Sequence, residues 1–275
     1  MRYKKKWYKK VLLFLFFAAA LIWTLVPVYI VISNSFRRTL DMKIMPPKLL
    51  FTPILSHYEK ILTLDNFSKY FRNSAVIAVS VTALTILLGT LAAYGMKLFK
   101  SRLGQHLSNV LLGKMVPAIT ILIPLFMMMN RLKLTGTFAA PILAHSCMSL
   151  PFVTWLMASF IRDIPTELLE SASVMGCSRM KAFWLIIVPL LKPAVASATI
   201  LVMQTSWNEL VFSLQLTNLK TYPLTVGVAR YVGAVSVDWG KCSAAAAITM
   251  VPIIIVGFAM QKYLVSGMTA GAVKG

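Results

Sequence analysis

Several polar side chains fall inside an otherwise apolar run near residue 205, and these residue types could do chemistry. Gln204 and Asn208 are four residues apart, as are Thr205 and Glu209, so on a helix they form one polar stripe. Amide, hydroxyl and carboxylate groups suit hydrogen bonding, either to a polar solute in a pore or to a neighbouring helix in a membrane. Both interpretations of the stripe stay open at this point.

Two more ionisable residues lie within apolar runs, where such groups are costly and by default mark a pathway. His145 falls at a similar depth to Glu209, so the two side chains could pair. Lys114 lies about seven residues, or about 10 Å, into its run. It can therefore also extend along its helix to the membrane interface. The substrate-pathway candidates are thus Lys114, His145, Gln204, Thr205, Asn208 and Glu209.

The sequence predicts neither a catalytic centre nor a metal site. The three cysteines and three histidines are scattered, and no C-x-x-C spacing occurs. The phosphate-binding pattern G-x-x-x-x-G-K-[ST] is absent. We therefore expect a chain that is not an enzyme and that binds no cofactor or metal itself.

The composition points to a membrane protein. Hydrophobic residues make up 58% of the 275 residues and charged residues only 13%, whereas soluble domains hold roughly 25% charged residues. The formal net charge is +20. Because the basic residues alternate with apolar runs, anionic lipid headgroups rather than nucleic acid are the expected partners of this charge.

Six apolar runs are long enough to cross a hydrocarbon core about 30 Å thick. The first is too long for the apolar region of a signal peptide, which is about 7–15 residues. An even number of spans places both termini on the same side of the membrane. The lysine cluster in residues 1–10 predicts that this side is the cytoplasm. We expect an all-α polytopic membrane protein, with a transmembrane domain over 11–264 and a tail over 265–275. Its spans are predicted at 11–32, 74–94, 107–129, 138–161, 193–216 and 242–263.

A polar insert at 164–193 separates the fourth and fifth runs and has its own helical pattern. Pro165 suits a helix start, and an apolar stripe of Leu168, Ala172 and Met175 follows at helical spacing. Gly176 can end this helix in a left-handed conformation. Ser178 can cap a second helix that runs from Arg179 to Val188. An amphipathic loop that lies on the membrane surface would show the same pattern.

The spacing in this insert resembles the Glu-Ala-Ala loop of ATP-binding-cassette (ABC) importer permeases. That loop reads E-A-A, three residues, G, nine residues, I-x-L-P. Here Glu170, Ala172, Gly176, Ile186 and Pro189 match it. Two positions depart from the pattern, because serine replaces the first alanine at 171 and valine replaces leucine at 188. The segment 115–126, the Trp-Asn-Glu run at 207–209 and the C-terminal 269–275 resemble the carbohydrate-uptake branch, whose maltose-type member is a six-span permease subunit.

The resemblance implies the type I ABC importer permease fold, with residues 162–192 as a cytoplasmic coupling helix-turn-helix loop. In this family that loop docks in a groove of the ATPase. The carried-over contact residues are Leu168, Glu170, Ala172, Met175 and Gly176. The implied partners are a second permease subunit, two ATPase subunits that bind ATP and Mg²⁺, and an extracytoplasmic solute-binding protein. The C-terminal tail would reach between the ATPase subunits, and the chain would lie in the bacterial inner membrane.

The resemblance also implies ATP-driven import of sugars, with di- or oligosaccharides as the expected cargo. Basic residues in segments expected outside, such as Arg37, Arg38, Lys43, Arg131 and Lys133, could instead favour an acidic sugar. They could equally face the binding protein or lipid headgroups. A glycerophosphodiester is another solute of the same importer class. An independent secondary transporter is the alternative outside this class, but it would have no use for a groove-docking helix.

Overall fold

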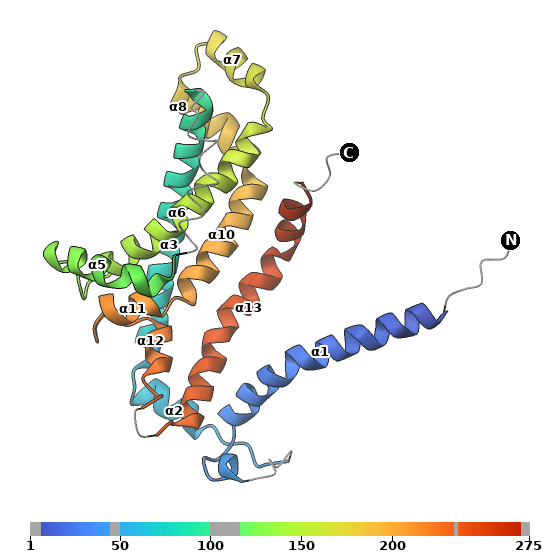
Figure 1. Cartoon of the computed structure of the whole chain (residues 1–275), viewed down its shortest axis with the longest axis vertical. Coiled ribbons are helices and arrows are strands. Elements are labelled where there is room, and N and C mark those ends of the chain that lie inside the picture. Colours follow the sequence, from blue (N-terminus) through green and yellow to red (C-terminus); the bar gives the residue numbers. More distant parts are fainter. Residues whose placement is uncertain (1–6, 45–49, 100–115, 234–235, 271–275) are drawn as a thin grey trace. The chain divides into compact units, whose positions relative to one another are not determined.

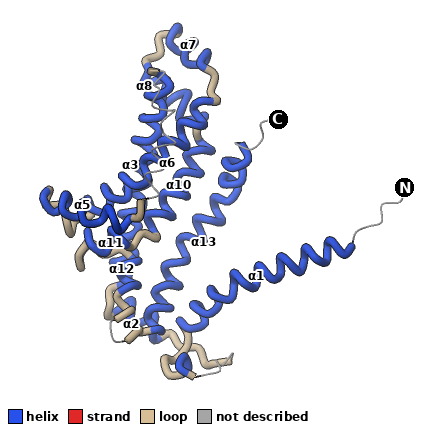
Figure 2. Tube along the Cα trace, in the orientation of Figure 1, coloured by secondary structure: helices blue, strands red, loops and turns tan. Residues whose placement is uncertain are grey.

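The computed structural model of the chain describes residues 7–44, 50–99, 116–233 and 236–270, and these fold almost entirely into helices (Figures 1 and 2). Strand-like pairing within these ranges is limited to one antiparallel bridge between Val232 and Val237. The all-α prediction is therefore confirmed. In chain order the helices are α1 (Trp7–Ser35), η1 (Asp41–Lys43), α2 (Ser56–Thr63), α3 (Phe67–Leu98), α5 (Ala118–Arg131), α6 (Ala139–Arg162), α7 (Thr166–Val174), α8 (Arg179–Ala182), η3 (Phe183–Ile187), α9 (Val188–Leu190), α10 (Lys192–Trp207), α11 (Val211–Leu216), α12 (Leu224–Ala229) and α13 (Trp239–Ala270).

Four helices in the described ranges are long and apolar enough to cross a membrane, namely α1, α3, α6 and the Trp239–Ala259 part of α13. A bent pair, Arg179–Leu190 and Lys192–Trp207, would add a fifth crossing. The third predicted span, 107–129, lies partly outside the described residues. Its described part belongs to α5, an apolar helix of 14 residues. The count of six spans therefore stays a prediction.

Three helices are longer than the runs that predicted them. α1 covers Trp7–Ser35 where the run 11–32 was predicted. α3 begins at Phe67, before the predicted start at 74, because Asn66 with φ of 52° ends the preceding turn and no proline interrupts the sequence from there to Leu98. α13 continues to Ala270, so the first part of the tail predicted at 265–275 is helical. Residues 271–275 lie outside the described ranges.

The prediction of a fifth span over 193–216 was wrong in one respect. The span was expected to be one helix, but α10 ends at Trp207 and α11 begins at Val211. The carboxylate of Glu209 accepts hydrogen bonds from the backbone N–H groups of Phe212 (2.8 Å) and Ser213 (3.0 Å). This side chain satisfies N–H groups that a new helix leaves without intrahelical partners, and so favours the restart over continuation.

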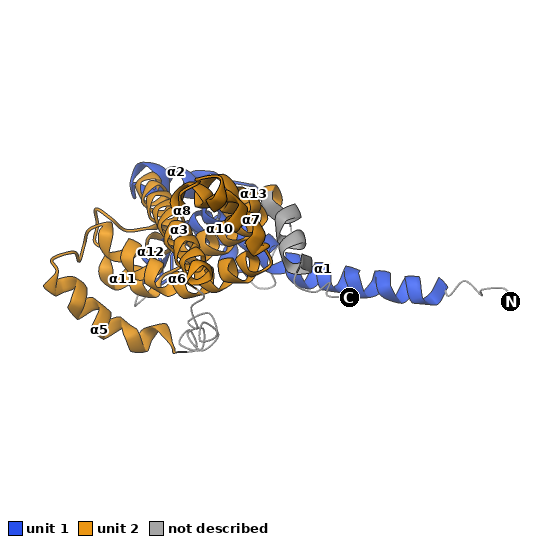
Figure 3. Ribbon diagram, turned by 90° about the horizontal axis from the view of Figure 1, so that it is seen from above, with its two compact units in different colours: residues 1–67, 228–250 blue, residues 68–227, 251–275 orange. Residues whose placement is uncertain are grey.

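The chain divides into two compact units, coloured separately in Figure 3: residues 1–67 with 228–250, and residues 68–227 with 251–275. In the first unit, Tyr58 donates a hydrogen bond to Ser35 Oγ (2.8 Å), and His57 Nε2 lies 2.8 Å from the carbonyl oxygen of Arg37. Asp65 pairs with Lys241 at 3.0 Å and also accepts a hydrogen bond from Tyr231. These contacts tie α1, α2 and the start of α13 together.

Two hydrophobic clusters of described residues hold helices of the second unit together. One joins α3, α6 and α10 to the η3 turn, and the other joins α5, α6 and α11. α3 and α6 approach closely at Gly89, where an added Cβ would lie 2.8 Å from Val153 Cγ1. Small residues at such crossings let helices pack tightly where burial of apolar surface gives little driving force, as in a bilayer.

A sharp bend precedes α10. The segments Arg179–Leu190 and Lys192–Trp207 meet at 77°, and Val188 N–H bonds Phe183 oxygen five residues back, which is a wide π-helical turn. Pro189 and Pro193 both lack the N–H that a continuous helix would need here. The bend thus marks the end of the loop and the start of the next apolar helix.

Candidate functional site

Residues 162–192, here called the 162–192 loop, form the predicted helix, sharp turn and helix. α7 begins at Thr166 directly after Pro165 and ends in a glycine turn, since Gly176 has φ of +77°. The N–H of Gly176 bonds Ser173 oxygen (3.0 Å), and the N–H of Cys177 bonds Ala172 oxygen (2.9 Å). This pair of bonds is a Schellman motif, which favours glycine at the left-handed position. The predicted glycine turn is therefore confirmed.

The second helix of the loop starts as its sequence predicts. The Ser178 hydroxyl accepts a hydrogen bond from the backbone N–H of Lys181 (3.3 Å), so Ser178 caps α8 at Arg179. The helix was expected to reach Val188. It continues through the π-helical turn to Leu190.

The apolar side chains of the loop divide between an outward and an inward set. Leu168 and Met175 are exposed, at 44% and 80% of their surface, whereas Ala172 is 2% exposed and packs within the chain. Val174 is the most exposed apolar side chain of the loop at 89%. Glu170 is also exposed. The stripe predicted from the helical period did not include Val174. The chain turns back directly after this residue, so helical spacing no longer predicts which side chains are exposed there.

A second candidate site centres on His145 and Glu209, whose pairing the sequence raised and the structure confirms. His145 Nε2 lies 3.0 Å from Glu209 Oε2, and His145 Nδ1 lies 2.9 Å from Ser206 Oγ. The Ser213 hydroxyl donates to the same carboxylate oxygen at 3.0 Å. A neutral imidazole that donates to Glu209 through Nε2 and accepts from Ser206 through Nδ1 satisfies every one of these groups.

This buried network borders a cavity of about 500 Å³. The cavity lies between α5, α6, α10 and α11, and carries both polar and apolar side chains. Thr205 lines it and donates its hydroxyl proton to Leu201 oxygen (2.7 Å). The lining residues are Val116, Ala118, His145, Cys147, Met148, Ser149, Pro151, Thr205, Ser206, Glu209 and Phe212.

The structure does not keep the predicted polar stripe together. Gln204 lies on α10 and is exposed, while Asn208 follows the last helical residue and Glu209 lies in the break before α11. Only Thr205 and Glu209 of the four line the cavity. Lys114 lies outside the described residues. The stripe was predicted for one uninterrupted helix, and the break after Trp207 separates its members.

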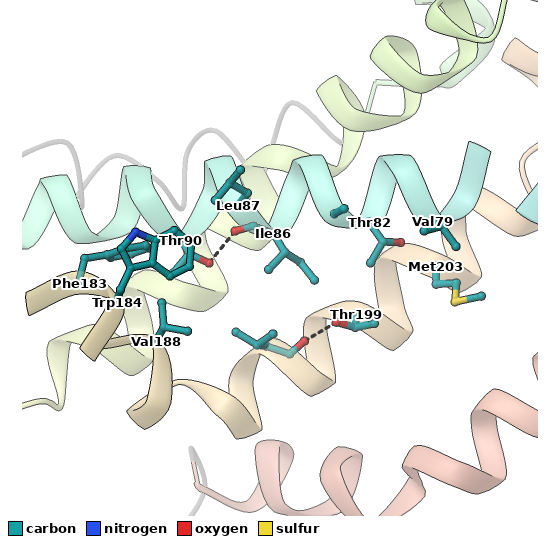
Figure 4. A pocket seen from close by; sticks show the side chains of 12 residues that line it. Val79, Thr82, Ile86, Leu87, Thr90, Phe183, Trp184, Val188, Thr199 and Met203 are labelled. Carbon is teal, nitrogen blue, oxygen red and sulfur yellow. Dashed lines mark hydrogen bonds between the residues drawn. The ribbon is translucent and has the colours of Figure 1, made fainter. Parts of the chain in front are cut away.

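A second cavity, of about 380 Å³, is lined by apolar side chains of α3, η3 and α10 (Figure 4). Its three threonine hydroxyls donate to backbone carbonyls of their own helices: Thr82 to Ala78 (2.7 Å), Thr90 to Ile86 (2.6 Å) and Thr199 to Val195 (2.8 Å). Hydroxyls so engaged have no proton left to donate to a polar ligand and can only accept. Trp184 and Met203 contribute further apolar surface to this cavity.

Apolar spans, a buried polar network beside a cavity and an exposed helix-turn-helix loop define a polytopic subunit of a membrane transport system. Residues 85–270 match the family described as binding-protein-dependent transport system inner membrane component. The chain belongs to this family, and it is accordingly a multi-pass protein of the inner membrane and a permease subunit.

Related proteins and structures agree with this assignment. The chain is 35% identical over 227 residues to the sulfoquinovosyl glycerol transport system permease protein SmoH of Agrobacterium fabrum, covering 81% of this chain and 79% of the relative. It is 34% identical over 238 residues to the trehalose/maltose transport system permease protein MalG of Thermococcus litoralis, covering 83% and 84%. A chain of a bacterial ABC transporter involved in the import of the acidic polysaccharide alginate shares the fold, with TM-score 0.81, 19% identity and coverage of 96% and 99%. The predicted importer permease fold is thus confirmed.

Proposed function

We propose that this chain is the permease subunit of an ATP-driven sugar importer, with di- or oligosaccharides as cargo. The family assignment supports the transport role, and the relatives at 34–35% identity, named for trehalose/maltose and for sulfoquinovosyl glycerol, support a sugar-containing solute. An acidic sugar or a glycerophosphodiester would belong to the same importer class.

The observation that carries the proposal is the 162–192 loop. Its glycine turn presents Val174 and Met175, two large apolar side chains that are 89% and 80% exposed. Apolar side chains so exposed at the tip of a polar loop suit a partner surface that excludes water from them. With Leu168, Glu170 and Gly176, they form the contact that we assign to the ATPase.

The remaining machinery is supplied by other subunits. A second permease subunit completes the pathway, two cytoplasmic ATPase subunits bind ATP and Mg²⁺, and an extracytoplasmic solute-binding protein delivers the sugar. This chain has no ATPase site of its own in the proposal. The 162–192 loop and both termini lie in the cytoplasm, six spans cross the membrane, and the basic residues near its surfaces meet lipid headgroups.

We assign the cavity beside His145 and Glu209 to the sugar pathway. Sugar hydroxyls donate and accept hydrogen bonds, and the cavity combines carboxylate, imidazole and hydroxyl groups with apolar surface. Its volume of about 500 Å³ falls within the range of about 300–1,000 Å³ that small-molecule sites occupy. Gln204, Asn208 and Lys114 remain candidates for other positions along the same route.

Co-purification with the ATPase of the importer tests the proposal. The complex should form with the unmodified chain and be lost with Gly176→Pro, because proline fixes φ near −65° and forbids the left-handed turn. The matched control is Leu40→Pro, in the exposed segment after α1, which should leave the complex intact. A proline at Gly95 would break α3 and is therefore not used. Uptake of radiolabelled maltose and trehalose, each competed with glucuronate oligomers, then separates neutral from acidic cargo. Intact ATPase capture by Gly176→Pro would contradict the assignment of the loop.

A further inference from the structure

The last turn of α3 contacts the arm of the 162–192 loop that leaves α6. Lys97 Nζ donates hydrogen bonds to the carbonyl oxygen of Ile161 (2.9 Å) and to that of Ile164. The end of a helix carries partial negative charge on its unpaired carbonyls, so a lysine there is favourably placed. Lys97 is half-buried, and its ammonium group uses one of its three donors on the last turn of α6 and another on this arm.

The same turn of α3 also contacts the arm that returns towards α10. Tyr94 OH donates a hydrogen bond to the carbonyl oxygen of Arg179 (2.9 Å), the first residue of α8. The ring of Tyr94 packs against that of Phe183, with centroids 5.3 Å apart. Tyr94 and Lys97 are three residues apart on α3 and so share one face.

Between these two contacts the loop is not packed tightly on α3. A cavity of about 370 Å³ separates them, lined by Tyr94, Lys97, Leu98, Thr166, Leu169, Glu170, Ser173, Arg179 and Ala182. Elsewhere Ile164 and Leu169 pack against the hydrophobic cluster of α3, α6 and α10, and the Arg179 guanidinium lies 5.5 Å from the centre of the Phe99 ring. Where the cavity replaces apolar packing, the hydrogen bonds of Tyr94 and Lys97 join the loop to α3 directly.

We propose that Tyr94 and Lys97 are positioning residues that fix both arms of the 162–192 loop to α3, so that a push on the loop moves α3. The inference rests on the proposed function, since the push is the one delivered by the ATPase. α3 is a single helix of 32 residues, about 48 Å long. At its other end Asn73 Nδ2 donates to the carbonyl oxygens of Lys220 (3.1 Å) and Tyr222 (3.0 Å). A displacement at the loop is thus carried to the segment that follows α11.

The free thiol of Cys147 gives a readout that needs no knowledge of the cargo, because this exposed cysteine lines the cavity beside His145. The experiment uses the complete importer with Cys177→Ser and Cys242→Ser in this chain. The rate at which a polar maleimide labels Cys147 is measured without nucleotide and with a non-hydrolysable ATP analogue. The difference between the two rates reports how far the ATPase moves the transmembrane helices.

The test variant combines Lys97→Met, which keeps the aliphatic stem, with Tyr94→Phe, which keeps the ring. Loss of a hydrogen bond from a charged donor shifts an equilibrium by about tenfold or more. We expect the nucleotide-dependent change in labelling rate to fall about tenfold while the ATPase still co-purifies. Lys97→Arg should restore it, since the adjoining cavity has room for the guanidinium. The matched control is Lys60→Met with Tyr8→Phe, two exposed residues outside the second unit, which should leave the change as it is.

The outcomes separate the two proposals. The proposed function is contradicted if the unmodified complex forms but its Cys147 labelling rate is the same with and without the ATP analogue. If nucleotide changes the Cys147 labelling rate equally in the unmodified complex and in the double variant, the positioning role of Tyr94 and Lys97 is contradicted, while the proposed function is not. Should Lys97→Met fail to reach the membrane, Tyr94→Phe alone is measured, and an unchanged response then overturns the proposal.

Discussion

His145 Nε2 and Glu209 Oε2 lie 3.0 Å apart and join α6 to the break between α10 and α11. The two side chains are 3% and 16% exposed. The same carboxylate caps α11 through the N–H groups of Phe212 and Ser213. One side chain therefore caps the start of α11 and joins the break before it to α6, at the edge of the cavity assigned to the sugar.

The first prediction concerns this pair. His145→Ala and Glu209→Gln should each lower the free energy of unfolding by about 1–3 kcal/mol, because each leaves a buried polar partner unsatisfied. A double-mutant cycle, read by thermal unfolding in detergent, should give a coupling energy of about 1 kcal/mol or more. The control cycle uses Asp65→Asn and Lys241→Met. That pair, also 3.0 Å apart, is 30% and 23% exposed, so its coupling should be about 0–1 kcal/mol. Equal coupling in the two cycles would contradict the prediction.

The sequence predicted those features that depend on short stretches of chain. Apolar runs located α1, α3, α6 and α13, and the glycine at 176 with the serine at 178 located the turn and the cap of the 162–192 loop. The helices depend on one continuous apolar run each, and the turn and the cap depend on residues within one helical turn of each other. Spacing alone therefore sufficed.

Features set by contacts between distant segments could not be predicted in this way. The break after Trp207 depends on whether Glu209 continues a helix or caps a new one, and its bonds to His145 and Ser213 favour the cap. Ala172 is buried and Val174 exposed because the chain folds back at Gly176. The contacts of Tyr94 and Lys97 with the loop join residues 64 to 85 positions apart, beyond the reach of any helical period.

The second prediction compares two glycines on α3. An added Cβ at Gly89 would lie 2.8 Å from Val153 Cγ1 and 3.2 Å from the backbone nitrogen of Thr154. Among the residues that the structure describes, one at Gly95 would meet nothing within 4 Å. Gly89→Ala should destabilise the protein by about 1–3 kcal/mol through overpacking of α3 against α6. Gly95→Ala should be neutral or stabilising by up to about 1 kcal/mol, since alanine favours helix. Melting temperatures in detergent measure both, and a ranking in the opposite order would show that the close approach of α3 and α6 is wrong.

The third prediction compares two glycines in the left-handed region. Gly136 has φ of +82° and Gly176 has φ of +77°, so alanine should cost about 1–2 kcal/mol of backbone energy at either position. At Gly136 a Cβ would also lie 2.6 Å from Asn218 Nδ2, while a Cβ at Gly176 would meet no atom of the described residues within 4 Å. Asn218 cannot simply swing away, because its Oδ1 accepts a hydrogen bond from the N–H of Lys220 (2.9 Å). Gly136→Ala should therefore lower the melting temperature more than Gly176→Ala does. Equal losses would mean that the side chain of Asn218 yields freely.

The fourth prediction addresses the tip of the 162–192 loop. Val174→Asp and Met175→Glu place carboxylates on side chains that are 89% and 80% exposed in this chain, so the melting temperature of the isolated subunit should change little. Binding to the ATPase should weaken by at least about tenfold, because a charge would have to lose its water in an apolar contact. Leu40→Glu, at a side chain that is 78% exposed outside the loop, is the matched control and should leave ATPase binding unchanged. Titration of labelled ATPase against subunit in nanodiscs gives the dissociation constants. Because the isolated subunit keeps its stability, a weaker complex reports the contact itself, and equal affinity for all three variants would place the ATPase elsewhere on the chain.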